Sequence, residues 1–107
     1  MTSPGPLVGE VLDGRYEITR LLGEGGMGMV YEGLQAALDR KVAIKVLHVR
    51  VAHDERYRER FLREARAAAR IRHANVVQIL DFGHTSTGSP YFAMEFLEGR
   101  DLRALLN

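Results

Sequence analysis

Apolar residues recur with two different periods along this chain. Over residues 41–47 the β-branched residues Val42, Ile44 and Val46 occupy every second position, which predicts a β-strand. One face of that strand carries Ala43, Lys45 and Leu47. Over residues 55–72 apolar residues recur every three or four positions, which predicts an amphipathic helix. The chain therefore combines at least one strand with one long helix.

Other short segments rich in β-branched and aromatic residues, bounded by turn-forming residues, also predict strands. Together the predicted strands cover residues 16–22, 28–34, 41–47, 76–82 and 91–95, with turns at 36–40 and 85–89. We expect an α+β fold in which a curled, five-stranded antiparallel sheet packs against the helix. The segment 1–15 is expected to be an N-terminal tail.

Residues 23–30 form a glycine-rich segment, Gly-Glu-Gly-Gly-Met-Gly-Met-Val, that fits the pattern G-x-G-x-x-G-x-V. Glycines allow backbone N–H groups to approach phosphate oxygens closely, since no Cβ intervenes. A dinucleotide-binding turn would open directly into a helix, whereas a strand-like run follows Gly28. No Gly-Lys-Ser/Thr closes the segment, which excludes a Walker A loop. A strand-turn-strand hairpin that covers phosphates remains.

Lys45 and Glu64 are the two charged residues that the pattern places on apolar faces. The chain has thirteen arginines but only two lysines, so a lysine within an apolar strand is not explained by composition. A compact ammonium suits a pair of phosphates, although an ordinary solvated strand lysine is the plainer alternative. At about 100° per residue, Glu64 falls within the apolar stripe of the helix, so either the stripe is frayed there or a cation from another element meets the carboxylate. Lys45 is the natural candidate.

Five motifs follow one another in a recognisable order. They are the glycine-rich segment, Val-Ala-Ile-Lys at 42–45, Arg-Glu-Ala at 63–65, His-Ala-Asn-Val-Val at 73–77 and Met-Glu-Phe-Leu-Glu-Gly at 94–99. In this order the chain resembles the small N-terminal lobe of a protein kinase, and more closely that of a bacterial eukaryotic-like (Hanks-type) serine/threonine kinase. The resemblance implies an ATP-binding lobe over residues 16–97, with the hinge exit and the start of a C-lobe helix at 98–107.

The resemblance also implies roles for particular residues. Lys45 would pair with the α- and β-phosphates of ATP and be held by Glu64. Met94 would be the gatekeeper of an adenine slot, Glu95 and Leu97 would read the adenine edge with backbone groups, and Asp101 would lie near the ribose. The whole implied nucleotide site is Leu22, Gly23, Glu24, Gly25, Gly26, Met27, Gly28, Val30, Ala43, Lys45, Met94, Glu95, Leu97 and Asp101. Taken singly, the apolar members are ordinary core residues.

The tripeptide Asp81-Phe82-Gly83 spells the magnesium-binding motif of the kinase family. It lies only seventeen residues after Glu64 and no His-Arg-Asp loop precedes it, so we interpret it as the end of a strand. The four histidines are not spaced as a metal cluster and there is no cysteine. We expect no metal site, and the protein ligands for the Mg²⁺ that accompanies ATP are not in this chain.

The length of 107 residues is far short of the roughly 250 that a two-lobed kinase would need. No catalytic aspartate or second Asp-Phe-Gly follows the hinge. We expect that the chain alone is inactive and acts on protein substrates only with a C-lobe. The alternatives are a non-catalytic, pseudokinase-like nucleotide-binding module that regulates a partner, and a plain interaction domain. Without a second lobe, an exposed face around Val30, Ala43 and Met94 would favour self-association.

Composition indicates the cellular location and the kinds of partner to expect. The net charge is +1, 46% of residues are hydrophobic, and no apolar run approaches the roughly 18 residues of a membrane span. The segment Met1–Pro6 lacks the basic and apolar regions of a signal peptide, and a chain without cysteine forms no disulfide. We therefore expect a cytoplasmic protein. The arginines of the helix alternate with glutamates, which favours a solvated face over a nucleic-acid surface.

Overall fold

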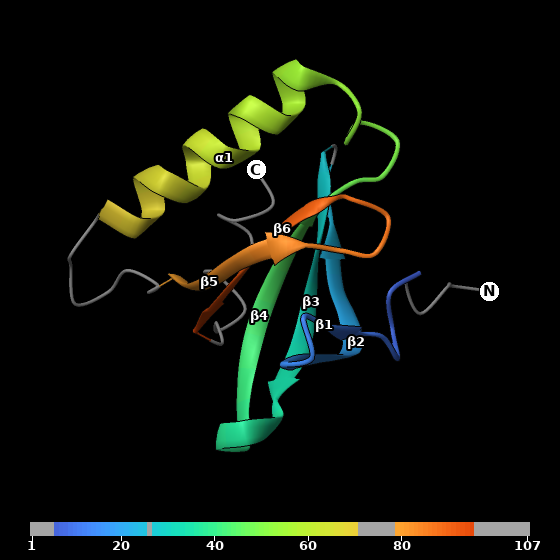
Figure 1. The fold of residues 1–107 in the computed structure, drawn as a ribbon, viewed down its shortest axis with the longest axis vertical. Helices are drawn as coiled ribbons and strands as arrows, with labels where there is room; N and C mark the ends of the chain where they lie inside the picture. Colours follow the sequence, from blue (N-terminus) through green and yellow to red (C-terminus); the bar gives the residue numbers. More distant parts are fainter. Residues whose placement is uncertain (1–5, 26, 71–78, 96–107) are drawn as a thin grey trace.

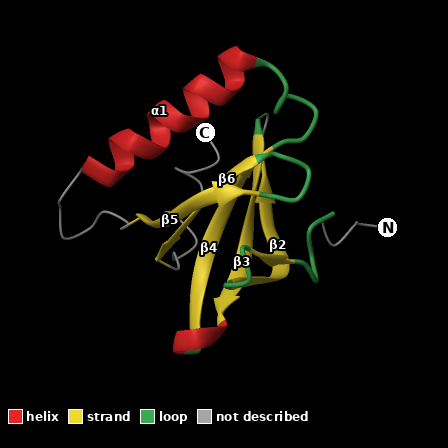
Figure 2. Ribbon diagram, in the orientation of Figure 1, coloured by secondary structure: helices red, strands yellow, loops and turns green. Residues whose placement is uncertain are grey.

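The computed structural model describes residues 6–25, 27–70 and 79–95. Within these residues, six strands form one antiparallel sheet in the order β1-β2-β3-β4-β6-β5, and helix α1 lies across one of its faces (Figures 1 and 2). The strands are Val11–Leu12 (β1), Tyr16–Glu24 (β2), Gly28–Gln35 (β3), Arg40–Leu47 (β4), Ile79–His84 (β5) and Pro90–Glu95 (β6). Helix α1 is Glu55–Arg70, and a short 3-10 helix, η1 (Ala36–Leu38), joins β3 to β4. The predicted α+β class is confirmed.

The sheet has one strand more than the five expected. Strand β1 lies in the segment 1–15 that was expected to be a tail, and its Leu12 is buried in the core. Asp13 and Gly14 both have positive φ, and the N–H of Arg15 donates to the carbonyl of Leu12, which makes a tight turn into β2. The ends of the other elements agree with the prediction to within a few residues. Residues 71–72 of the expected helix and 76–78 of the expected strand lie outside the described residues.

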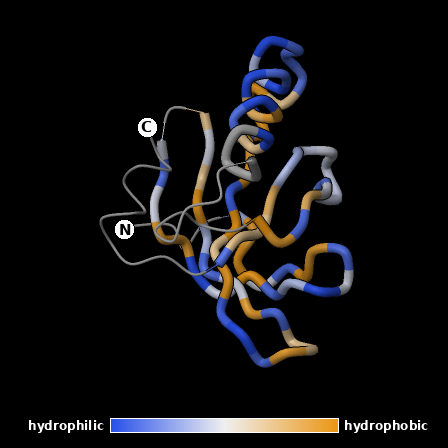
Figure 3. Tube along the Cα trace, turned by 90° about the vertical axis from the view of Figure 1, so that its left-hand side faces the viewer, coloured by the Kyte–Doolittle hydropathy of each residue, from blue (hydrophilic) through white to orange (hydrophobic). Residues whose placement is uncertain are grey.

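The alternation of β4 divides the core into two clusters, one on each face of the sheet. The helix-side cluster is buried between the sheet and α1 and consists of Val30, Ala43, Leu47, Ala52, Phe61, Ala65, Phe92 and Met94. The far-side cluster consists of Leu12, Tyr16, Ile18, Met29, Tyr31, Val42, Ile44, Val46, Tyr91 and Ala93. Figure 3 shows hydrophobic positions gathered in the strands, while much of α1 is hydrophilic. Burial on both faces is what fixes the register of β4.

Helix α1 starts where Asp54 can cap it. The Asp54 carboxylate accepts a hydrogen bond from the backbone N–H of Arg56 at 2.9 Å, which satisfies one of the unpaired donors of the first turn. Further along, the Phe61 ring packs against Phe92 of β6 with ring centroids 5.3 Å apart. The cap and this contact together fix the helix over the centre of the sheet.

The Asp-Phe-Gly tripeptide lies inside strand β5, as its position in the sequence indicated. The Asp81 carboxylate accepts a hydrogen bond from the Tyr16 hydroxyl at 3.0 Å and forms an ion pair with Arg15 at 2.9 Å. Beside them, the Tyr91 hydroxyl donates to Asp13. These contacts tie the β1–β2 turn to β5 and β6. The other Asp81 oxygen accepts a hydrogen bond from the Phe82 backbone N–H at 2.8 Å, so three donors engage this carboxylate.

Glu32 supports one prediction about acid stability. It is almost fully buried and is bonded to Arg20 and Lys41, and its hydrogen bond with Arg20 is the main reason that its pKa lies below the ordinary 4.5. A carboxyl group whose pKa is lower in the folded than in the unfolded state stabilises the fold at pH values above its unfolded pKa. This contribution is lost as the pH falls through the folded pKa. Glu32→Gln should therefore lower the free energy of unfolding at pH 7 by only about 1 kcal/mol, because Arg20 and Lys41 are well exposed. The variant should also lose less stability than the wild type below pH 5.

Urea unfolding of the wild type and Glu32→Gln between pH 3 and 7 measures this effect. Glu17→Gln is the matched control, because Glu17 is exposed on the neighbouring strand β2. An unchanged acid limb in Glu32→Gln would mean that the ion pairs of Glu32 do not stabilise the fold.

Candidate functional site

Lys45 lies at the centre of the sheet, on the face that α1 covers. Its register partners are Val30 on β3 and Phe92 on β6, and both belong to the helix-side cluster. Only 12% of the Lys45 side-chain surface is exposed, and Nζ lies 3.9 Å from Oε2 of Glu64 on α1. The strand and the helix thus bring together the two charged residues that the sequence placed on apolar faces.

Glu64 itself is more exposed than its position on the helix indicated. The apolar stripe is frayed at this point, because 42% of the Glu64 side-chain surface is exposed, and Lys45 is the cation from another element that meets the carboxylate. It lies at the rim of the helix contact, where solvent removes most of the desolvation cost. Its other oxygen is 3.4 Å from Nε of Arg60, one helical turn earlier. An ion pair this exposed contributes at most about 1 kcal/mol to stability, so its consequence is mainly positional.

The environment of Lys45 disfavours its positive charge. Burial lowers the pKa of Lys45, the Glu64 carboxylate opposes that shift, and the positive charge of Arg60 adds to it. A partly desolvated ammonium gains more from an anion than a solvated one does, because the low dielectric strengthens the attraction. Lys45 is therefore prepared to receive a negatively charged group such as a phosphate.

The glycine-rich segment is the turn of a β-hairpin, which confirms the strand-turn-strand prediction. Strand β2 ends at Glu24 and β3 begins at Gly28, and the N–H of Gly25 donates to the carbonyl of Gly28 at 2.8 Å. Gly23 pairs with Val30 across the hairpin, whereas Gly26 lies outside the described residues. Gly28 is buried, and a Cβ on it would lie 2.6 Å from the carbonyl oxygen of Val46. At this position the glycine is required by contact between strands.

The four apolar residues expected to line an adenine slot come together in the helix-side cluster. Ala43 pairs with Met94, Val30 lies on the adjacent strand, and Leu22 packs against the group from β2. The expectation that this face is exposed is wrong: Val30 and Ala43 are fully buried and Met94 is 1% exposed. An adenine ring could reach them only if neighbouring side chains move apart.

The other predicted members of the site lie at its edges. Glu95 is exposed at the end of β6, where it pairs with Val42. Met27 is half-buried and packs against the helix-side cluster from the hairpin turn. Leu97 and Asp101 lie outside the described residues.

Two residues near Lys45 were not singled out from the sequence. Arg60 contacts Glu64, and its spacing of four residues along the helix was the available signal. Phe92 pairs with Lys45 across β4 and β6 and is 3% exposed. The alternation of residues 90–95 could have placed Phe92 on the Lys45 face, but the partner strand could not be known.

The described residues contain no group of three or more His, Asp or Glu side chains that could hold a metal ion. In the same part of the chain, no helix has the length and apolar character to cross a membrane.

Comparison with known proteins places this arrangement in a family. The sequence profile of the protein kinase domain matches residues 16–107. The serine/threonine-protein kinase pkn3 of Myxococcus xanthus is 43% identical over 100 residues, which are 94% of this chain and 18% of that protein. PrkC of Bacillus subtilis is 42% identical over 97 residues, which are 91% of this chain and 15% of that protein. The chain therefore spans less than a fifth of the length of these relatives.

Solved structures agree with the sequence comparison. A crystal structure of the Mycobacterium tuberculosis PknI kinase domain superposes with a TM-score of 0.68 at 32% identity, over 89% of this chain and 37% of that one. PpkA-294 in its apo form gives a TM-score of 0.69 at 27% identity, over 95% and 43% of the two chains. The chain thus belongs to the protein kinase family and corresponds to the N-terminal lobe of bacterial Hanks-type serine/threonine kinases.

Proposed function

We propose that this chain is the ATP-binding lobe of a cytoplasmic serine/threonine protein kinase. The observation that carries the proposal is Lys45, a shielded ammonium with a lowered pKa held 3.9 Å from Glu64. An ion pair that adds so little stability is a poor reason to bury a lysine, whereas positioning a phosphate ligand is a sufficient one. Family membership supplies the chemical context, since protein kinases transfer the γ-phosphoryl group of ATP to protein hydroxyls.

In this proposal each part of the site has one task. Lys45 pairs with the α- and β-phosphates, and Glu64 keeps its ammonium pointed at them. The hairpin from Gly23 to Gly28 covers the phosphates with backbone N–H groups. Leu22, Val30, Ala43 and Met94 receive the adenine ring once the side chains around them move apart. The backbone at Glu95 and Leu97 reads the edge of the ring, with Asp101 at the ribose.

Phosphoryl transfer itself needs groups from a second lobe. The described residues offer no cluster that fits Mg²⁺, and three donors engage the carboxylate of Asp81. In-line transfer also needs a carboxylate to orient the substrate hydroxyl. The chain thus binds and orients ATP, while the catalytic base, the metal ligands and the groove for the protein substrate come from a C-lobe. A regulatory, pseudokinase-like module is the second candidate if nucleotide binds but no transfer occurs with a C-lobe present.

A series of nucleotides tests the proposal. If Lys45 contacts the α- and β-phosphates, ADP should retain most of the affinity of ATP. AMP should bind roughly 10- to 100-fold more weakly, which corresponds to one lost charge-assisted contact. Isothermal titration of the purified protein with each nucleotide and Mg²⁺ measures the three dissociation constants. Equal binding of ATP, ADP and AMP would show that Lys45 does not contact the β-phosphate, and no binding of any of them would support a plain interaction domain.

A further inference from the structure

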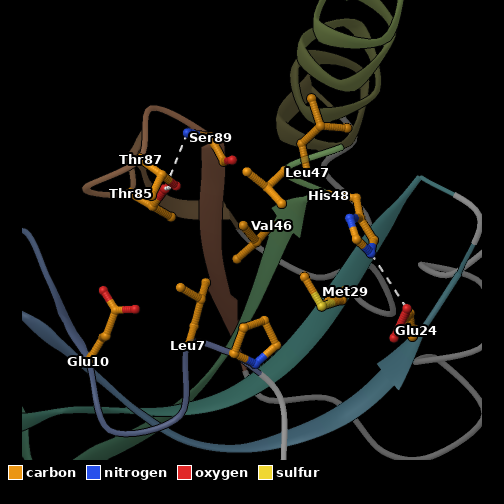
Figure 4. Close-up of a pocket in the computed structure, with 12 residues that line it drawn as sticks. Leu7, Glu10, Glu24, Met29, Val46, Leu47, His48, Thr85, Thr87 and Ser89 are labelled. Atoms are coloured by element: carbon orange, nitrogen blue, oxygen red, sulfur yellow. Dashed lines mark hydrogen bonds and ion pairs between the residues drawn. The ribbon is translucent and has the colours of Figure 1, made fainter. Parts of the chain in front are cut away.

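A cavity of about 280 Å³ lies on the far side of the sheet from Lys45. Its floor includes Met29 and Val46, two members of the far-side cluster, and its walls come from the segment before β1 and the turn at 85–89 between β5 and β6 (Figure 4). Leu7, Leu47 and Val49 complete a mostly apolar lining. This volume is close to the lower end of the range for small-molecule sites, which suits one ring with a short arm.

Two buried polar atoms in the cavity lining have no hydrogen-bond partner among the residues that the structure describes. Ser89 is 2% exposed and its Oγ is unpaired, although its backbone N–H donates to the Thr85 hydroxyl and its carbonyl accepts from the Thr85 N–H. The Nδ1 atom of His48 is unpaired as well, while its Nε2 atom lies 3.6 Å from a Glu24 carboxylate oxygen. Both side chains border the same space (Figure 4). Unpaired buried polar groups are costly, so a ligand that reaches them gains their hydrogen bonds.

The charges around the cavity have one sign. Among the described residues, its lining contains the carboxylates of Glu10 and Glu24 but no lysine or arginine. Their combined field reaches Tyr31, whose buried hydroxyl contacts the sulfur of Met29 at 3.3 Å. Burial is the main reason that the pKa of Tyr31 is raised, a hydrogen bond with the Leu7 backbone opposes the rise, and Glu24 and Glu10 both add to it. The cavity therefore favours a positively charged occupant.

We propose that this cavity is a binding site for a small organic cation with an apolar body. The apolar part fills the space against Met29 and Val46, and a protonated amine at its end meets the carboxylate of Glu24. The floor of this cavity is on the opposite face of the sheet from Lys45, although Glu24 of the glycine-rich hairpin and Leu47 of the helix-side cluster also border it.

Phenethylammonium is a suitable probe, because it joins one apolar ring to a primary ammonium. The protein is labelled with ¹³C at its methionine methyl groups and titrated with the probe to millimolar concentration. The Met29 methyl reports on this cavity, and the Met94 methyl reports on the helix-side cluster. We expect a saturable shift of the Met29 signal with Met94 unchanged. Phenylacetate, which has the same ring and the opposite charge, should leave both signals unchanged.

Variants test the contact with Glu24. Glu24→Gln should weaken phenethylammonium binding about two- to fivefold, the loss expected for one partly exposed charge pair, while Glu59→Gln on the exposed face of α1 should change nothing. The proposal is overturned if phenylacetate binds as well as phenethylammonium, if Met94 responds in place of Met29, if neither probe binds, or if Glu24→Gln binds like the wild type.

Discussion

Replacing Lys45 by methionine should reduce the affinity for ATP roughly 10- to 100-fold, the effect of losing a charge-assisted contact to phosphate. The fold should persist, because methionine fills a similar volume and the Lys45–Glu64 pair contributes little to stability. Titration of the variant with ATP and Mg²⁺, beside circular dichroism of the same sample, measures both quantities.

The second lysine of the chain provides the control. Lys41 lies on the same strand, its side chain is 67% exposed and it is 3.4 Å from Glu32. Lys41→Met removes the same charge from the same strand, yet should leave the affinity for ATP within about twofold of the wild type, because a solvated charge away from the ligand contributes little. Equal losses in the two variants would mean that only the net charge matters, and an unfolded Lys45→Met variant would make Lys45 a structural residue.

The Lys45 variant also has a distinct pH dependence. The pKa of Lys45 is lowered in the folded state, so its charged form opposes folding at pH 7. Wild-type stability therefore increases as the pH rises from the folded pKa of Lys45 towards its unfolded pKa of 10.5. Lys45→Met lacks this group. Its stability at pH 7 should be equal to or above that of the wild type, and the alkaline increase due to Lys45 should be absent.

Substituting Gly28 by alanine should destabilise the fold by about 1–3 kcal/mol, which is the typical cost of overpacking a core. The added Cβ would lie 2.6 Å from the Val46 carbonyl oxygen. The Cβ is attached directly to the β3 backbone and the oxygen belongs to the backbone of the paired strand β4, so neither atom can turn away. Urea unfolding with matched m-values measures the change.

Gly33, on the same strand, makes a useful comparison. Its added Cβ would lie 2.7 Å from the terminal methyl of Ile44, which can change rotamer, and 3.1 Å from the Glu17 carbonyl oxygen. Gly33→Ala should therefore destabilise less than Gly28→Ala. The opposite order, or a Gly28→Ala variant as stable as the wild type, would refute the strand-contact explanation. If the order holds, loss of ATP binding in a Gly28 variant is not by itself evidence of phosphate contact.

Much of the fold could be predicted because its signals are local. The alternation of residues 41–47 gave the correct faces of β4, since this strand is paired on both edges and buried on both sides. Strand β1 was missed because two residues are too short for a periodic pattern, although Asp13-Gly14 is a hairpin-turn signal. Local patterns thus identify the long elements better than the short ones.

The site was less predictable, because exposure depends on distant segments. The helical period placed Glu64 on the apolar side of α1, but it cannot show where the contact with the sheet ends, and Glu64 lies just at that rim. The burial of Met94 and the cavity beneath Ser89 likewise depend on segments far apart in the sequence. Such features follow only from tertiary packing.

The most direct test of the account is to locate ATP on the protein by its effect on the methionine methyl groups. Met27 and Met94 belong to the Lys45 side of the sheet, and Met29 belongs to the far side. We predict that ATP with Mg²⁺ shifts the ¹³C-methyl signals of Met27 and Met94, that Lys45→Met weakens this response, and that Met29 is unaffected. A response confined to Met29, or no response at saturating ATP, would contradict a nucleotide site at Lys45.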